Sequence, residues 1–165
     1  MKQQPPFIKS STVIKGFQES TLAKSEDNDC VVLSIASAFG VNYDAAHEFV
    51  KNTFKRENRQ GTRNFPKTLT RYALEHKEMF GANIVPMGTM IETYNYSLRY
   101  TVKVGKDYVS RGMTVHTFIK NNPVGTFIVV VKGHAFTIID GVVVGNYDDA
   151  VKKKKIIYDA WEVIF

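Results

Sequence analysis

The stretch from Cys30 to Phe39 constrains the fold more than any other part of the chain. Its sequence, CVVLSIASAF, is apolar nearly all the way round a helix and has small side chains at positions 34, 36, 37 and 38. A helix without a polar face must be buried, and small side chains let it lie close to a sheet. We therefore expect a buried helix that begins near Cys30, with Asn28 or Asp29 as its cap and Gly40 at its end.

Periodicity predicts three further helices. One is capped by Asn42, a second opens at Pro66, and a short one is capped by Thr114 and ends before Pro123. Polar and apolar residues alternate between positions 94 and 104, which suggests one or two strands.

The C-terminal third predicts four strands, at 125–131, 134–139, 142–146 and 156–165. The Asp140-Gly141 dipeptide between the second and third is typical of a two-residue hairpin turn. The expected fold is therefore α+β, with N-terminal helices packed on a C-terminal antiparallel β-meander. Residues 1–25 are largely polar, and we expect an extended or flexible segment there, followed by a single domain over 26–165.

The composition is that of an ordinary folded domain. The chain has 165 residues, of which 44% are hydrophobic and 23% charged, and this balance argues against disorder. No apolar run reaches the roughly 18 residues of a membrane helix. The N-terminus is polar and lacks the apolar region of a secretory signal. We expect no membrane insertion and a cytoplasmic location.

The net charge of +6 is concentrated near the C-terminus. Four of these charges belong to one run, which leaves +2 for the rest of the chain. The run is Lys152, Lys153, Lys154 and Lys155. Such a run between two strand-like segments is usually a solvated turn, and a phosphate-binding patch is the alternative. Because no aromatic residues are interleaved with the lysines, nucleic acid is not the expected partner.

The cysteine and histidine content argues against a metal site. One cysteine cannot form an internal disulfide or a thiolate-rich zinc site. The four histidines lack the spacing of metal-binding motifs. No metal and no other cofactor is expected.

Cys30 and His134 are the side chains that could form a nucleophilic site. A thiol is reactive once its proton has left, and both a helix N-terminus and a nearby imidazolium lower its pKa. Cys30 would have the first of these, and His134 would supply the second if its strand packs against the helix. His134 could then protonate the leaving group, while a third polar group fixes the imidazole.

Asn146 and Asp148 are the candidates for that third group. A two-residue hairpin brings the end of strand 142–146 back beside His134, which favours Asn146. Asp148 could take the role if the strand is longer.

The blocks around Cys30 and His134 resemble those of the small papain-like cysteine peptidase domains found in bacteriophages. They read NDCVVLSIA at 28–36 and GTFIVVVKGHAFTIIDG at 125–141. A more distant similarity is to C39-type bacteriocin-processing peptidases, and the likeness extends from about residue 26 to about residue 148. The resemblance implies a papain-like fold with Cys30 as nucleophile, His134 as base and acid, and Asn146 as orienting residue. It also implies a peptide or protein substrate and no cofactor.

One position departs from the family pattern. Papain-like enzymes usually place a Gln shortly before the cysteine, where it helps to form the oxyanion hole, and here Ala23 stands in that region. Asn28 is the nearest side-chain amide and could donate to the oxyanion together with the Cys30 backbone, or it could serve only as a helix cap. Losing such a donor typically costs about 10²–10³ in rate.

The sequence therefore predicts a cysteine hydrolase, most simply a peptidase that works through an acyl-enzyme. A first alternative is a catalytically inactive papain-like module, which either binds a host or virion protein or is a structural part of the virion. A second is a nucleic-acid-associated protein that uses the lysine run. If the chain is phage-encoded, its expected location is the host cytoplasm or the virion.

Overall fold

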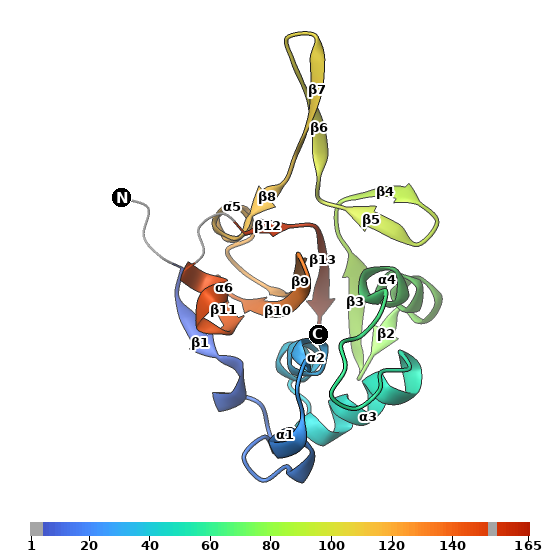
Figure 1. The fold of residues 1–165 in the computed structure, drawn as a ribbon, viewed down its shortest axis with the longest axis vertical. Coiled ribbons are helices and arrows are strands. Elements are labelled where there is room, and N and C mark those ends of the chain that lie inside the picture. The colour runs from blue at the N-terminus through green and yellow to red at the C-terminus, as the bar shows by residue number, and fades with distance from the viewer. Residues whose placement is uncertain (1–4, 152–154) are drawn as a thin grey trace.

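A seven-stranded sheet forms the centre of the molecule (Figure 1). The computed structural model describes residues 5–151 and 155–165. The strand order is β1-β11-β10-β9-β13-β3-β2, and neighbours are antiparallel except β1, which pairs in parallel with β11. The strands are β1 (Phe7–Lys9), β2 (Glu78–Met79), β3 (Ala82–Pro86), β9 (Thr126–Val131), β10 (His134–Ile139), β11 (Val142–Gly145) and β13 (Asp159–Ile164).

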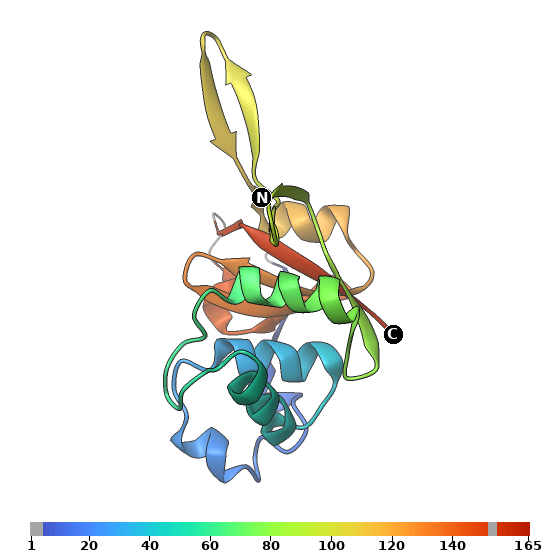
Figure 2. The same cartoon turned by 90° about the vertical axis from the view of Figure 1, so that its right-hand side faces the viewer.

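Helices cover both faces of this sheet (Figure 2). On one face α2 (Cys30–Phe39) and α4 (Phe65–His76) pack on the strands, and α3 (Tyr43–Thr53) packs on α2. On the other face α5 (Val115–Asn121) and α6 (Tyr147–Val151) cover a second apolar cluster. The expected α+β class is confirmed, and α2 is the buried helix that the sequence predicts, with Val32 and Ile35 fully buried.

Local signals place the helix ends. Asn42 caps α3 by accepting from the Asp44 N–H, and Thr114 caps α5 by accepting from the Thr117 N–H. Gly40 ends α2 with a φ of 65°, a left-handed conformation that glycine adopts without strain. These ends confirm the predictions from the sequence.

Residues 5–25 are folded against the rest of the chain, which differs from the extended or flexible segment that the sequence suggests. β1 adds to the sheet beside β11, and it is followed by a 3-10 turn, η1 (Ser10–Thr12), and by α1 (Thr21–Ser25). Between them Ile14 enters the core. Main-chain pairing and three buried residues, Ser10, Ile14 and Ser20, thus attach this largely polar segment.

The C-terminal meander has three consecutive strands rather than four. β9, β10 and β11 follow one another, but β13 returns beside β9 and not beside β11. The outer edge of β11 is already paired with β1. On its other side β13 pairs with β3, which extends the sheet.

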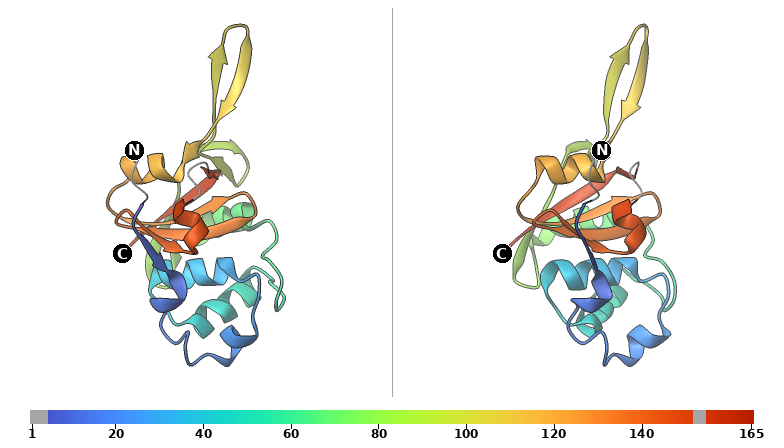
Figure 3. Two further views of the ribbon diagram at one scale, coloured as in Figure 1. Left: turned by 60° about the vertical axis from the view of Figure 1, so that its left-hand side comes forward. Right: turned by 90° about the vertical axis from the view of Figure 1, so that its left-hand side faces the viewer.

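The segment from 89 to 114 contains more strands than its pattern suggests. It supplies β4 (Thr89–Glu92), β5 (Asn95–Ser97), β6 (Tyr100–Val104), β7 (Asp107–Arg111) and β8 (Met113–Thr114). β4 pairs with β5, β6 with β7, and β8 with β12 (Ile156–Ile157). The β6–β7 hairpin projects from the body of the molecule in every view (Figures 1, 2 and 3). No helix in the described part of the chain has the length and apolarity needed to cross a membrane.

Candidate active site

Cys30 is the first residue of α2, at a helix end that no side chain caps. Asp29 occupies the N-cap position but makes no cap hydrogen bond, and its carboxylate accepts instead from the Tyr43 hydroxyl at 2.7 Å. The unpaired N–H groups and the partial positive charge of the helix end therefore remain beside the thiol. This is an environment that favours a thiolate.

His134 is the first residue of β10, the strand against which α2 packs. Two hydrogen bonds fix the helix on this strand. Thr137 donates to the Ser34 carbonyl at 2.9 Å, and Ser37 donates to the Thr137 hydroxyl at 3.0 Å. With α2 held in this position, the Cys30 thiol forms a hydrogen bond with the His134 imidazole and accepts another from the Ala135 N–H.

The two side chains shift each other's pKa. Burial alone would raise the pKa of the Cys30 thiol, but the hydrogen bonds from His134 and from the Ala135 N–H lower it below its ordinary value. Asp149 and, after it, Cys30 raise the pKa of His134 to about 9, although burial opposes the shift. Both shifts favour a thiolate paired with an imidazolium.

Asp149 holds the imidazole from behind. Both of its carboxylate oxygens lie 3.1 Å from His134 Nε2, and its side chain is 1% exposed. The carboxylate also accepts from the Asn146 N–H at 2.7 Å and from Lys155 Nζ at 2.8 Å. Burial raises its pKa, but these three donors together keep the pKa below the ordinary value. Asp149 is therefore a buried, ionised partner for His134.

The contact with Asp149 determines which ring nitrogen of His134 faces the carboxylate and which is left for Cys30. Because Nε2 faces the carboxylate, the other nitrogen, Nδ1, is the one that remains for Cys30. An Nε2–H donated to Asp149 fixes the tautomer in which Nδ1 can take the thiol proton.

The sequence predicts Asn146 as the orienting residue, or Asp148 in its place, whereas the structure gives the contact to Asp149. The reason is that β11 ends at Gly145 and the chain then turns into α6, so Asn146 does not continue the strand. Asn146 takes part through its backbone N–H, and both it and Asp148 are solvent-exposed.

A signal for Asp149 is present in the sequence. The motif Asn146-Tyr147-Asp148-Asp149 matches a capping box, in which an acidic side chain three positions after the cap accepts from the N–H of the cap residue.

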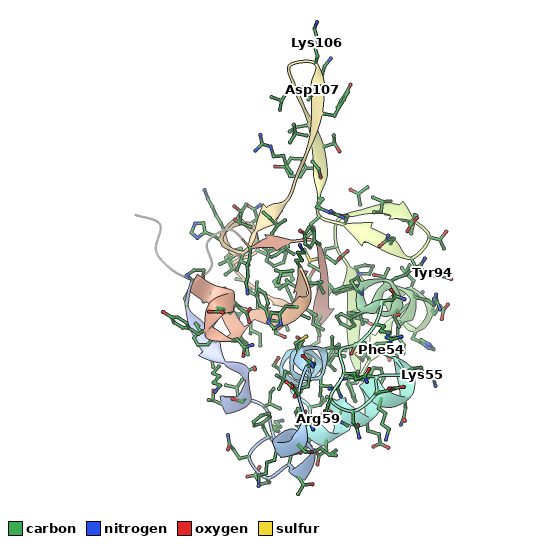
Figure 4. The ribbon with its side chains drawn as sticks, viewed as in Figure 1. Phe54, Lys55, Arg59, Tyr94, Lys106 and Asp107 are labelled. Carbon is green, nitrogen blue, oxygen red and sulfur yellow. The ribbon has the colours of Figure 1, made fainter. Side chains whose placement is uncertain are left out.

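Within the described residues, the Asn28 side chain makes no cap hydrogen bond to α2 and no hydrogen bond to Cys30. Its backbone is left-handed, with φ of 54°, and its side-chain amide donates to the Arg59 carbonyl at 3.2 Å. This hydrogen bond connects the residues before Cys30 to the loop between α3 and α4. Arg59, which Figure 4 labels, belongs to that loop.

A buried ion cluster fixes the same loop. Glu26 accepts from Arg56 at 2.6 Å and from the Arg59 N–H at 2.6 Å, and its carboxylate is also in hydrogen-bond contact with His47 Nε2. Arg56 also donates to the Asp27 carbonyl at 3.0 Å. The Glu26 and Arg56 side chains are 3% and 1% exposed. This cluster joins the residues before Cys30 to the loop that lines one side of the site.

Two hollows meet at Cys30 and His134. The larger has a volume of about 180 Å³. Besides the pair and Ala135 it is lined by Val31, Gly61, Thr62, Phe65, Val130 and Gly133. The smaller is a recess of about 10 Å³, roughly the space of one water molecule, between η1, α2 and the ends of β10 and β11. The thiol therefore lies at the junction of an apolar cleft and a narrow recess.

Of the lysine run, Lys152, Lys153 and Lys154 lie outside the described residues, and Lys155 contacts Asp149. Within residues 5–151 and 155–165, no group of three or more His, Cys, Asp and Glu side chains is arranged to hold a metal ion. Comparison with protein-family models, curated proteins and solved structures finds no match to this chain.

Proposed function

We propose that this chain is a cysteine hydrolase that cleaves an amide bond in a peptide or protein, with Cys30 as nucleophile, His134 as proton carrier and Asp149 as orienting residue. The observation that carries the proposal is the series thiol, imidazole and buried carboxylate at an uncapped helix end. This series is also the basis for proposing kinship with the small papain-like peptidase domains of phages, and with it a location in the host cytoplasm or the virion.

The proposed reaction has two halves. The Cys30 thiolate attacks the carbonyl carbon, and the imidazolium of His134 gives its proton to the leaving amine as the C–N bond breaks, which produces a thioester. Neutral His134 then takes a proton from water as the resulting hydroxide adds to the thioester carbonyl, and the C–S bond breaks. The thiolate is left paired with the His134 imidazolium, and the carboxylic acid product leaves and loses its proton to solvent. Asp149 stays ionised and holds the ring in both halves.

The oxyanion would be held at the open end of α2. The Cys30 backbone N–H supplies one donor. The Asn28 amide nitrogen carries two hydrogens, and its bond to Arg59 uses one of them, so the other can serve as a second donor.

The apolar cleft favours an apolar side chain next to the scissile bond. Its walls include Val31, Phe65 and Val130, which offer no charged group to a ligand. We propose that the peptide places a branched or aromatic residue there, while the recess of about 10 Å³ on the other side admits only a small group.

The pH dependence of Cys30 alkylation by iodoacetamide tests the proposal directly. Cys30 is the only cysteine, so every labelled thiol reports on this site. In the wild-type protein we expect the labelling rate to reach its maximum already at a pH below about 8, because the thiolate is present there. His134→Ala should label slowly and only at alkaline pH, and Asp149→Asn should fall between the two. Identical profiles for wild type and His134→Ala would contradict the proposal.

Cleavage is tested with a peptide library that varies the residues around one central amide, analysed by mass spectrometry for new termini. We expect products that carry an apolar residue on one side of the cut, and none from Cys30→Ala. A thioester trapped at Cys30 at low pH would identify the acyl-enzyme.

A second candidate function is a papain-like binding module without activity. It is favoured by Ala23 in the region where a Gln is usual and by the bond that holds Asn28 on Arg59. An activated Cys30 that labels rapidly, together with no cleavage across the library, would support this module over the hydrolase.

A further inference from the structure

The β6–β7 hairpin projects from the body of the molecule and is almost wholly exposed (Figure 1). Gly105 and Lys106 join its strands, and Gly105 has the positive φ, 64°, that a type II′ turn requires at its first central position. Figure 4 labels Lys106 and Asp107 at the tip, far from the body. Nine of the ten strand residues are exposed and the tenth, Val102, is half-buried, so the hairpin lies outside both core clusters.

The strand register divides the hairpin into two unlike faces. Cross-strand partners point to the same side, and successive residues point to opposite sides. One side therefore carries the pairs Tyr100/Arg111, Val102/Val109 and Val104/Asp107, which we name the apolar hairpin face. The opposite side carries Thr101/Ser110 and Lys103/Tyr108.

The apolar hairpin face leaves apolar area in water. Tyr100 is 55% exposed, Val104 49% and Val109 38%. A two-stranded hairpin is at best marginally stable by itself, and a contiguous exposed apolar surface generally marks a binding site. We propose that the apolar hairpin face packs on the same face of a second copy of this chain, with the two hairpins antiparallel. The proposal is independent of the hydrolase function.

The charges on this face identify the second copy as its partner. Asp107 is at the tip and Arg111 at the base of β7, four residues apart or about 13 Å at the usual rise of a strand. In an isologous dimer, a twofold axis at the Val102/Val109 pair sets the tip of each hairpin over the base of the other. Asp107 of each copy then faces Arg111 of the other, and Val104 faces Tyr100.

The antiparallel arrangement is preferred to the parallel one. With both tips at the same end, Val104 of one copy would lie over Asp107 of the other. It would then remove water from the carboxylate, and no cation would lie beside it in compensation. The antiparallel arrangement also puts the two bodies at opposite ends of the paired hairpins, as the projection of the hairpin in Figure 3 allows. Because the hairpin is only five residue pairs long and this face carries three of them, we expect a weak dimer with a dissociation constant of roughly micromolar order.

Charge reversal with rescue tests the proposal. The full chain and its variants are compared by sedimentation equilibrium up to several hundred micromolar, at about 50 mM salt so that ion pairs are not screened. Asp107→Arg and Arg111→Asp should each weaken the dimer at least about tenfold by setting like charges against each other. The double variant D107R/R111D should return to within about threefold of wild type.

Two controls make the result decisive. Lys103→Asp changes the charge by the same amount on the opposite face and should leave the dimer unchanged, and circular dichroism checks that each variant is folded. Val109→Glu, at the centre of the apolar hairpin face, should abolish association. A wild-type monomer at the highest concentration would overturn the proposal, and so would a dimer that both single reversals leave intact or that the double variant fails to restore.

Discussion

Lys155 and Asp149 form an ion pair of 2.8 Å on the carboxylate that also contacts His134. Lys155 is the last residue of the lysine run, and its side chain is 19% exposed whereas that of Asp149 is 1% exposed. The sequence suggests a solvated turn here, but this lysine supplies a positive charge to a buried carboxylate. It compensates the Asp149 charge when His134 is neutral, which is the state that a general base requires.

Lys155→Gln removes that compensation and should lower the free energy of unfolding by about 1.5–3 kcal/mol, the usual contribution of a hydrogen bond to a charged group. Cys30 alkylation near neutral pH should slow by less than in His134→Ala, because His134 keeps its contact with Asp149. Urea denaturation and iodoacetamide labelling measure the two effects. Lys120→Gln, an exposed lysine on α5, is the matched control. Equal behaviour of the two variants would show that Lys155 does not support the site.

The paired shifts of Cys30 and His134 predict an unusual dependence of stability on pH. The pKa of His134 is raised from about 6.5 to about 9, so its contribution is full below about pH 6.5 and is lost as pH rises through about 9. The pKa of Cys30 is lowered, so its contribution is present above the ordinary thiol pKa, about 8.5, and is lost as pH falls through the folded value. Below about pH 8.5 the two slopes oppose each other, so the free energy of unfolding of the wild type should change less with pH than His134 alone would make it change.

Cys30→Ser removes the contribution of Cys30 to the pH dependence of the free energy of unfolding. The contribution of His134 remains, because His134 keeps Asp149 as its main partner. Relative to wild type, this variant should lose about 1–2 kcal/mol of unfolding free energy between roughly pH 6.5 and 8.5. Urea midpoints across that interval, with reductant present, provide the test. In the double variant Cys30→Ser/His134→Asn, the free energy of unfolding should no longer change across this interval. A level profile for Cys30→Ser alone would mean that His134 is not held protonated.

The sequence predicts most of the elements that form the site. A helix beginning at Cys30 and a strand beginning at His134 follow from local patterns, and α2 and β10 begin at these residues. Their packing requires only that an apolar helix with small side chains lies on a sheet, which the residue types already imply. The Asn42 and Thr114 caps were predictable for the same reason, since the side-chain oxygen satisfies the adjacent N–H groups.

Two parts of the fold could not be obtained from local patterns. The pairing of β3 with β13 joins residues about 80 positions apart, and nothing in either segment specifies the other. The hairpin register predicts Asn146 as the orienting residue only if the strand continues past Gly145, and the chain leaves the sheet there. Strand ends depend on tertiary context, so a site residue at a strand end is harder to identify than one at a helix start.

Gly145→Ala should disconnect Asp149 from His134. A Cβ built at Gly145 would lie 2.5 Å from Asp149 Oδ2 and 3.0 Å from Phe136 Cβ, so the carboxylate must move. Without it the imidazole loses the main cause of its raised pKa, and Cys30 should label more slowly at neutral pH, as in Asp149→Asn. Gly61→Ala is the control for added bulk beside the thiol, because Gly61 also lines the cleft but a Cβ there meets nothing within 4 Å. Unchanged labelling in Gly145→Ala would show that Asp149 does not control the reactivity of Cys30.

Glu26→Gln should be the most destabilising of these substitutions. Burial raises the pKa of Glu26, but Arg56, His47 and the Arg59 N–H outweigh this effect and hold it at about 2. Removing one partner of a buried ion pair typically costs about 3–5 kcal/mol, because the remaining Arg56 is left buried without its anion. Glu48→Gln, on the exposed side of α3, should cost little.

The same cluster predicts acid sensitivity. With a folded pKa of about 2, the Glu26 carboxylate stabilises the fold above its ordinary pKa of about 4.3, and this contribution is lost as pH falls toward 2. Wild type should therefore lose stability more steeply than Glu26→Gln between about pH 5 and 2, and urea midpoints measure both slopes. Because the cluster holds the loop beside Cys30, limited proteolysis of residues 55–64 should accelerate in Glu26→Gln at neutral pH. Parallel acid profiles for the two proteins would show that the cluster does not anchor this loop.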